Sequence, residues 1–296
     1  MRDANTHAGG SPAQENASSP GSRYGSWVDE AVASHYNLGI ELTRLMPEGE
    51  ASLELVRTLE LLERRLPPPP AGVLDVGGGP GVYATILARR GYRVHLVDAL
   101  ELHVEQAAAA AAAQPEASFT AALGDARHLA EEDESWDVVV LLGPLYHLTE
   151  AEDRLQALSE ARRVLRPGGV VVGAAISRFA PLLDGFRQGL LTDPIFLGVV
   201  ERDLQDGQHR NPAGIDRPDW FTTSFLHHPD ELAQEVAAAG LTLEAVLGVE
   251  GPGWLFENWW NDLSRPEICL RAARVVEQEP ALQAISGHLL VVARKP

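Results

Sequence analysis

Residues 73–84, VLDVGGGPGVYA, constrain the fold of this chain more than any other segment. Apolar, strand-forming residues lead directly into a glycine-rich turn, and a helix-like pattern follows from Val82. This order is typical of the first strand, turn and helix of an open α/β sheet, where the turn faces a bound ligand. A side chain at Gly77 or Gly79 would occupy the ligand's space, so these glycines indicate close approach of the backbone to a cofactor.

Strand and helix patterns alternate from this turn to the end of the chain, with one long interruption. The segments predicted as strands are 73–76, 93–97, 117–123, 136–142, 170–176, 243–249 and 288–294. The segments predicted as helices are 82–90, 102–113, 151–165, 229–239 and 267–278. Strands this apolar are usually buried on both faces, as in a parallel sheet covered by helices. The sequence therefore predicts an α/β, Rossmann-like fold.

The spacing of the glycines separates the classes of ligand that such a turn can hold. A dinucleotide fingerprint needs glycine at the first, third and sixth positions, but the sixth position counted from Gly77 is Val82. A phosphate-binding loop needs a lysine, and none is near the turn. What the chain has instead is Asp75 followed by the alternate glycines Gly77, Gly79 and Gly81.

Acidic residues follow the next two predicted strands. Asp98 ends the second strand, where a carboxylate can accept both hydroxyls of a ribose, and Asp125 follows the third strand within Gly124-Asp125-Ala126. With these features the chain resembles the class I S-adenosylmethionine-dependent methyltransferases, from about residue 70 to 176 and more weakly over 229–295. The resemblance implies a seven-stranded, mostly parallel sheet whose antiparallel last strand, 288–294, lies beside the fifth.

The resemblance also implies a role for each loop at the cofactor. Asp75 would organise the turn and the cofactor's ammonium group, and Asp98 would bind the ribose. Asp125 would accept from the adenine amino group, while the backbone N–H of Ala126 bonds a ring nitrogen. Leu142 begins the segment 142–148, which would line the methionine portion and the transferred methyl group.

A helix before the core closes over the cofactor in many similar small-molecule methyltransferases. Residues 27–46 and 52–66 have helical patterns here, and four prolines at 67–70 end the second one. Tyr36 and Arg44 lie in the first of them, where Arg44 could pair with the methionine carboxylate and Tyr36 could hydrogen-bond it. Polar surface residues of an amphipathic helix are the alternative interpretation of both.

The composition of the remaining segments predicts the domain organisation. Residues 1–22 are polar and rich in glycine and serine, which predicts a disordered tail. The segment 178–228 has no clear periodicity and carries scattered aromatic residues, so we expect a cap over the substrate. The predicted parts are a tail at 1–22, a helical lid at 23–70, a cofactor-binding core at 71–177, the cap at 178–228, and the rest of the core with an aromatic and helical insertion at 229–296.

The net charge of −18 disfavours several classes of partner. It repels phosphate backbones and anionic lipid, so we expect neither nucleic acid nor a membrane as partner. The single cysteine, Cys269, fits a reducing compartment, and we expect a cytoplasmic protein. An aromatic group (Trp254, Phe256, Trp259, Trp260) could close the pocket or form a homodimer contact.

The predicted function is transfer of a methyl group from S-adenosylmethionine to an O, N or C nucleophile of a small metabolite, as in specialised metabolism. His147 is the candidate general base, since histidine titrates near neutral pH. Tyr146, Arg178, Trp220 and Phe225 are the candidate substrate contacts, and we expect no required metal. An NAD(P)-dependent oxidoreductase and a non-catalytic S-adenosylmethionine-binding protein are the alternatives.

Overall fold

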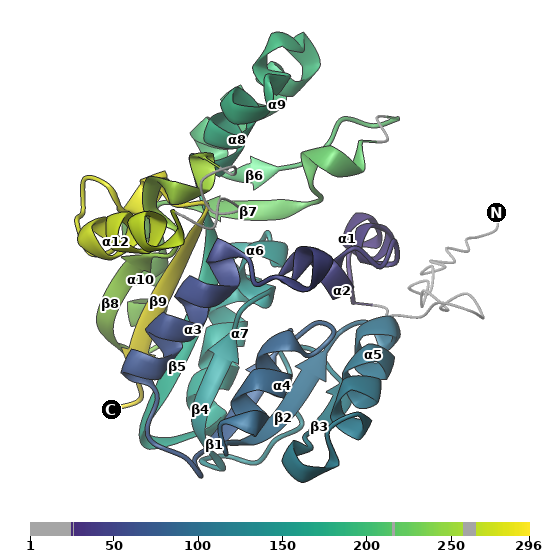
Figure 1. The fold of residues 1–296 in the computed structure, drawn as a ribbon, viewed down its shortest axis with the longest axis vertical. Helices are drawn as coiled ribbons and strands as arrows, with labels where there is room; N and C mark the ends of the chain where they lie inside the picture. The colour runs from purple at the N-terminus through teal and green to yellow at the C-terminus, as the bar shows by residue number, and fades with distance from the viewer. Residues whose placement is uncertain (1–24, 26, 215–216, 257–264) are drawn as a thin grey trace, which may run out of the picture.

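One mixed β-sheet organises the chain (Figure 1). The computed structural model describes residues 25, 27–214, 217–256 and 265–296, so the tail predicted at 1–22 lies outside the described residues. Within these ranges, the strands are β1 (Gly72–Val76), β2 (Arg93–Asp98), β3 (Thr120–Leu123), β4 (Trp136–Leu141), β5 (Leu165–Ser177), β6 (Gln208–His209), β7 (Ser224–His227), β8 (Thr242–Gly248) and β9 (His288–Arg294).

The core of the sheet has the predicted α/β arrangement. Strands β3, β2, β1, β4 and β5 are neighbours in that order and run parallel. Strand β9 pairs antiparallel with β5, and β8 pairs antiparallel with β9. These seven strands confirm the predicted sheet and its antiparallel last strand. The two additional short strands, β6 and β7, continue from the end of β5 into the cap.

The register between β5 and β9 decides which residue of the last strand reaches the edge of the sheet. Ile176, near the end of β5, lies opposite His288, the first residue of β9. On its other side, β9 places Leu289 opposite Gly248 at the end of β8. His288 therefore lies at the edge where the parallel strands end, which is the edge where open α/β sheets bind ligands.

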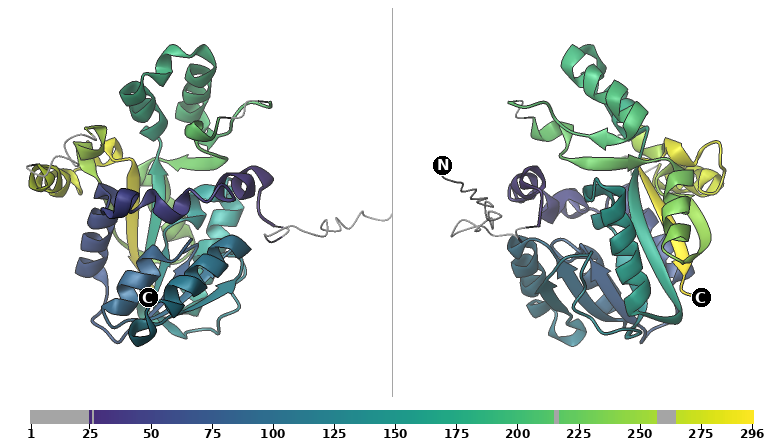
Figure 2. Two further views of the ribbon diagram at one scale, coloured as in Figure 1. Left: turned by 45° about the vertical axis from the view of Figure 1, so that its right-hand side comes forward. Right: turned by 180° about the vertical axis from the view of Figure 1, so that it is seen from behind.

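Helices cover both faces of the sheet, as Figures 1 and 2 show. Val138 and Val140 of β4 pack with α3 (Leu53–Arg65), α4 (Val82–Arg89) and α5 (Glu101–Ala112). Val139 and Leu141 point the other way and pack with α7 (Ala151–Val164) and α10 (Pro229–Ala238). Because successive side chains of a strand alternate between faces, a continuously apolar strand fills both cores at once.

The N-terminal helices differ from the single helix predicted over 27–46. The structure has α1 (Glu30–Tyr36) and α2 (Glu41–Arg44), followed by η1 (Pro47–Gly49). Gly39, with φ +75°, lies between the two helices and breaks the predicted one. The second helix agrees with the prediction, because Ser52 accepts from the Leu55 N–H and caps α3.

The cap is the region where the sequence indicated least. It contains α8 (Ala180–Gln188), η3 (Leu190–Thr192), α9 (Pro194–Asp206) and η4 (Pro218–Trp220), which extend beyond the carboxyl end of β5 (Figure 1). Phe196, Val200 and Trp220 form a small core of its own. The other elements are η2 (Pro115–Ala117), α6 (Pro144–His147), η5 (Gly251–Leu255), α12 (Pro266–Val276) and η6 (Gln283–Ile285).

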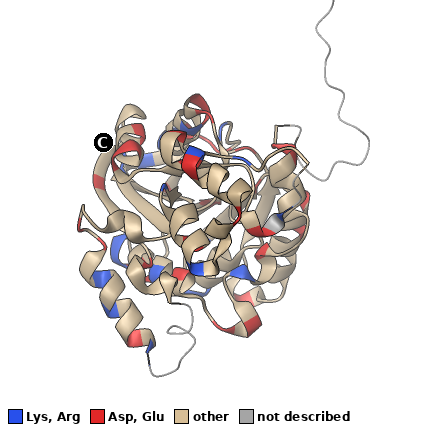
Figure 3. Ribbon diagram, turned by 90° about the horizontal axis from the view of Figure 1, so that it is seen from above, with Lys and Arg blue, Asp and Glu red and all other residues tan. Residues whose placement is uncertain are grey.

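Acidic and basic residues are spread over the helices and loops in the view from above, where the ribbon is coloured by residue type (Figure 3). Within the described ranges, every helix is too short or too polar to cross a bilayer.

Candidate active site

The glycine turn lies between β1 and α4 and forms one wall of a narrow cleft. Gly77 and Gly79 have φ values of +70° and +56°, which side chains rarely adopt. A Cβ on Gly77 would lie 2.6 Å from the ring of Pro144. A Cβ on Gly79 would meet only Glu41, at 3.7 Å, and would project into the cleft. The turn is therefore a cradle whose free space a side chain would fill.

Asp98 joins the ends of the first two strands. Its carboxylate accepts from the backbone N–H of Gly79 at 2.9 Å and of Leu100 at 3.0 Å, and it lies 3.1 Å from His103 Nδ1. The side chain is 6% exposed and lines the cleft. Asp98 thus fixes the glycine turn while its remaining lone pairs face the position that a ribose would take.

Asp125 has a partner that was not predicted from the sequence. Arg127 donates to it from Nη2 at 2.8 Å and from Nε at 3.1 Å, and Arg127 Nη1 also donates to Asp153 at 2.8 Å. Both Asp125 and Ala126 line the cleft, as predicted from their place after the third strand. A basic residue two positions after the acid was the available signal for this pair.

Asp75 lies in β1 beneath the turn, completely buried. Among the described residues, neither carboxylate oxygen has a hydrogen-bond partner. Burial, with a smaller contribution from the charge of Asp98, raises the pKa of Asp75 to about 7. A buried carboxylate without a partner is costly. Asp75 is not part of the wall of the cleft and makes no hydrogen bond to the turn, which corrects its predicted place at the cofactor.

We call the space around these residues the glycine cleft. Its volume is about 180 Å³. The predicted site residues that line it are Tyr36, Arg44, Gly77, Gly79, Asp98, Asp125, Ala126, Leu142, Tyr146 and His147. They come from the N-terminal helices and from the ends of four strands, so the fold brings together segments that lie far apart in sequence.

A second and wider space of about 1060 Å³ lies under the cap, and we call it the cap cavity. Its wall includes Leu190, Phe196, Trp220 and Phe221 of the cap. Five residues line both spaces, which therefore adjoin: Tyr36, Arg44, Glu54, Tyr146 and His288. We call these five residues the junction.

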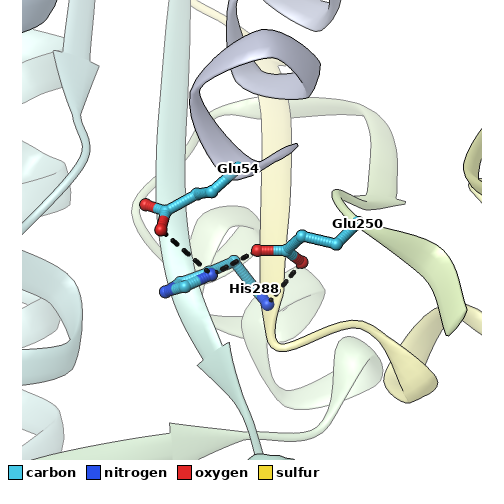
Figure 4. A group of neighbouring side chains, drawn as sticks. All are labelled: Glu54, Glu250 and His288. Carbon is cyan, nitrogen blue, oxygen red and sulfur yellow. Dashed lines mark hydrogen bonds and ion pairs between the residues drawn. The ribbon is translucent and has the colours of Figure 1, made fainter. Parts of the chain in front are cut away.

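Two glutamates flank His288 at the junction (Figure 4). His288 Nδ1 lies 2.5 Å from Glu250 Oε1 and 3.9 Å from Glu54 Oε2. Burial alone would lower the pKa of His288, but the two carboxylates raise it to about 9. No sequence pattern predicts this group, since its members lie on α3, after β8 and at the start of β9 with no shared motif.

Arg44 is held between two acids at the junction. It donates to Glu41 through Nε at 2.8 Å and to Glu54 through Nη1. Burial alone would lower the pKa of Arg44, but Glu54 and Glu41 raise it well above its usual range. Pairing of Arg44 with a methionine carboxylate stays a prediction, and it would have to compete with these two side chains.

His147 makes hydrogen bonds through both ring nitrogens. Its Nδ1 lies 3.2 Å from the Thr223 carbonyl oxygen, which can only accept, so Nδ1 carries the proton. Its Nε2 then accepts from the Tyr36 hydroxyl at 2.7 Å. Burial lowers the pKa of His147 to about 4. The imidazole is therefore neutral and joins Tyr36 of α1 to Thr223, just before β7.

The four predicted substrate contacts divide into two pairs. Tyr146 and Trp220 line the cap cavity. Arg178 and Phe225 line neither space, which corrects their predicted place. The buried Arg178 donates to the Leu226 carbonyl and to Glu231. The centre of the Phe225 ring lies 3.7 Å from the guanidinium carbon of Arg154. Both therefore fasten the cap strand β7 to the core.

The aromatic group predicted near residues 254–260 is only partly described. Trp254 lines the cap cavity and donates from Nε1 to the Ile285 carbonyl. Phe256 is 51% exposed, and Trp259 and Trp260 lie outside the described residues.

Comparisons with known proteins agree with this geometry. Residues 73–169 match a family model described as a methyltransferase domain. A ubiquinone biosynthesis O-methyltransferase of Caulobacter sp. (strain K31) is 31% identical over 178 residues, covering 60% of this chain and 62% of the relative. An S-adenosyl-L-methionine-dependent Diels-Alderase of Talaromyces variabilis is 31% identical over 170 residues, covering 46% of this chain and 57% of the relative. This chain thus spans less than two thirds of the length of either relative.

Solved structures show the same fold. A methyltransferase structure from Methanosarcina mazei superposes with a TM-score of 0.54 at 17% identity, covering 79% of this chain and 96% of that one. Over residues 73–169 the chain is therefore similar to methyltransferase domains, and its fold is that of the S-adenosylmethionine-dependent methyltransferase from Methanosarcina mazei. The cofactor of these similar proteins is S-adenosylmethionine, and the free space over Gly79 fits a ligand that approaches the backbone closely.

Proposed function

We propose that this chain transfers the methyl group of S-adenosylmethionine to a hydroxyl oxygen of a small, largely apolar molecule in the cap cavity. One observation carries the proposal: the glycine cleft and the cap cavity share five wall residues. A methyl group at that end of the cleft would face an acceptor directly. When bound, S-adenosylmethionine supplies an electrophilic methyl group on a sulfonium, so alignment and exclusion of water are the main tasks of the protein.

The chain's own residues would divide these tasks by place. Asp98 and Asp125 would hold the ribose and the adenine, and the charge of Asp75, beneath the turn, would attract the ammonium group through an ordered water. Tyr36 and His147 are hydrogen-bonded to each other across the cleft. This contact ties α1 to α6 and would keep water from the reacting end.

The walls of the cap cavity support the choice of acceptor. Leu190, Phe196 and Trp220 present apolar surface that would enclose an apolar body. Oxygen is the proposed nucleophile because the Caulobacter relative is named an O-methyltransferase and because the junction carries groups that can accept a proton, developed below. The Caulobacter relative is also named for the biosynthesis of a small molecule, which favours a small metabolite over a nucleic acid as the acceptor.

The test combines binding with turnover. By calorimetry, we expect S-adenosylmethionine and its demethylated product to bind, and NADH not to bind. With a methyl-labelled donor and a panel of apolar phenols and alcohols, we expect label on an acceptor oxygen and one demethylated cofactor released per transfer. NADH binding without S-adenosylmethionine binding would favour the oxidoreductase alternative.

Cofactor binding without release of the demethylated product would favour a protein that holds the cofactor without transferring its methyl group. This outcome needs its own arm, because one relative is named a Diels-Alderase. Leu190→Trp is the matched variant: it would place an indole in the wall of the cap cavity and narrow it, so we expect acceptor turnover to fall while cofactor affinity is unchanged.

A further inference from the structure

We propose that His288 is the catalytic base for the acceptor hydroxyl, with Nε2 as the atom that takes the proton, and that Glu250 positions its imidazole. The inference rests on the proposed function and names the proton acceptor at the same site. It is carried by the hydrogen bonds around the ring and by the place of His288 at the junction.

Glu250 holds His288 at two points. Its Oε2 accepts from the backbone N–H of His288 at 3.0 Å, and its Oε1 lies 2.5 Å from ring Nδ1 (Figure 4). Glu250 is 3% exposed, so its carboxylate has little freedom to turn away. Two contacts to one residue fix both the ring and its tautomer, because a proton on Nδ1 faces the carboxylate and leaves Nε2 as the basic nitrogen.

The other ring nitrogen is open to the site. In Figure 4, Nε2 lies on the side of the ring away from Glu250. Among the described residues, Nε2 has no hydrogen-bond partner, and it is not fully buried. The atom is therefore accessible, and His288 lines both the glycine cleft and the cap cavity. An acceptor oxygen at the junction could reach Nε2 and the methyl group together.

The charges around the ring favour a proton on it. Glu54 approaches from the first turn of α3, Glu250 from the segment after β8, and Arg44 from α2. The two carboxylates outweigh both burial and the opposing charge of Arg44, which together would lower the pKa of His288. An imidazolium formed during the reaction would thus be stabilised where it forms, and the raised basicity suits a weakly acidic hydroxyl.

The proposed step balances. The hydroxyl proton moves to Nε2 while an oxygen lone pair forms the new bond to the methyl carbon. The carbon–sulfur bond breaks with its electron pair staying on sulfur, so the positive charge of the sulfonium reappears on the imidazolium. The proton then leaves His288 to solvent after product release.

His147, the base predicted from the sequence, differs from His288 in each of these respects. Both of its nitrogens have partners, burial lowers its pKa to about 4, and it lines only the glycine cleft. The two histidines can therefore be separated by experiment.

The test measures His288→Gln and Glu250→Gln in the full-length protein. For His288→Gln we expect kcat to fall about 100-fold or more, with S-adenosylmethionine affinity changed less than about threefold. For Glu250→Gln we expect a smaller fall and an acid limb of the kcat–pH profile displaced to lower pH. In the wild type that limb should lie near the raised pKa of about 9. A purely structural role of Glu250 would not displace it.

Histidine NMR gives a readout without an acceptor. The His288 signal is identified as the one absent from His288→Gln. In the wild type it should titrate near pH 9, and the neutral ring should carry its proton on Nδ1. In Glu250→Gln its pKa should be at least about one unit lower. The matched control is His95→Gln, since His95 also pairs with a glutamate, Glu131, at 3.5 Å but lines neither space. We expect it to retain kcat within about twofold.

Each contrary result has a distinct meaning. If the wild type turns over and His288→Gln keeps kcat within about threefold of it, the inference is overturned and the proposed function stands. Absence of turnover in the wild type itself would overturn both. A third result would be loss of activity on chelation that Mn²⁺ restores, with Mn²⁺ binding to the wild type but not to His288→Gln. It would mean that a cation bound by Glu54, Glu250 and His288 acts in place of the base, and it would overturn the inference.

Discussion

The glycine cleft and the cap cavity adjoin, yet they are built in opposite ways. The cleft is narrow, about 180 Å³, and its wall comes from the ends of β1 and β2, the segments that follow β1 to β4, the helices α1 to α3, and the start of β9. The cap cavity is wide, about 1060 Å³, and its wall comes from α2, α8, α9 and segments near the C-terminus. A narrow cleft with fixed carboxylates suits one defined ligand, whereas a wide aromatic cavity can be adapted to different acceptors. If the proposed function is right, the difference separates binding of the cofactor from selection of the acceptor.

The sharpest test of this separation is Asp98→Ala. Hydrogen bonds to a charged group contribute about 1.5–3 kcal/mol, so we expect S-adenosylmethionine affinity to fall by at least about tenfold, measured by calorimetry. Asp133→Ala is the control, because Asp133 is 74% exposed and pairs with Arg163 away from both spaces. Unchanged affinity in Asp98→Ala would remove this residue from the cleft's ligand set.

We expect the pH dependence of cofactor affinity to arise at the glycine cleft and not at the cap cavity. Asp75 lies beneath the turn with a raised pKa of about 7, so its carboxylate becomes ionised as pH rises from 6 to 7.5 and would then attract an ammonium group through an ordered water. We expect affinity for S-adenosylmethionine to rise about eightfold over this range, following the ionised fraction. Asp75→Asn should bind more weakly and lose the dependence. Equal pH dependence in both proteins would contradict the assignment.

The smallest expected effect concerns the contact between the two regions. Phe221 has φ +69°, and its ring lies 5.4 Å from His35 and 5.8 Å from His147 between ring centres. Glycine accepts this backbone conformation without strain, so Phe221→Gly removes the ring at little cost in backbone strain. We expect the acceptor KM to rise about fivefold, in line with one lost aromatic contact, and cofactor affinity to stay within about twofold. A parallel loss of both would mean that cleft and cavity are not separable.

The two histidines illustrate how far sequence reasoning could go. His147 follows the fourth strand, so its position at the cleft could be predicted from order alone. Its hydrogen bonds to Tyr36 and Thr223, and with them its neutral state, could not. Glu54, Glu250 and His288 follow no common motif, and only the pairing of β9 with β5 and β8 brings the last two together. No spacing rule in one sequence encodes such a contact.

By itself, the sequence determined the sheet, the glycine turn and the acids after the second and third strands. The physical reason is that these features are local: apolar strands, positive φ at glycine and a carboxylate at a strand end each depend on a few adjacent residues. Tertiary structure decided the rest, which includes the break between α1 and α2, the helices of the cap, and the loss of Arg178 and Phe225 from the site. It also decided the junction, because ring orientation, burial and pKa depend on charges that α2, α3, the segment after β8 and β9 bring to one point.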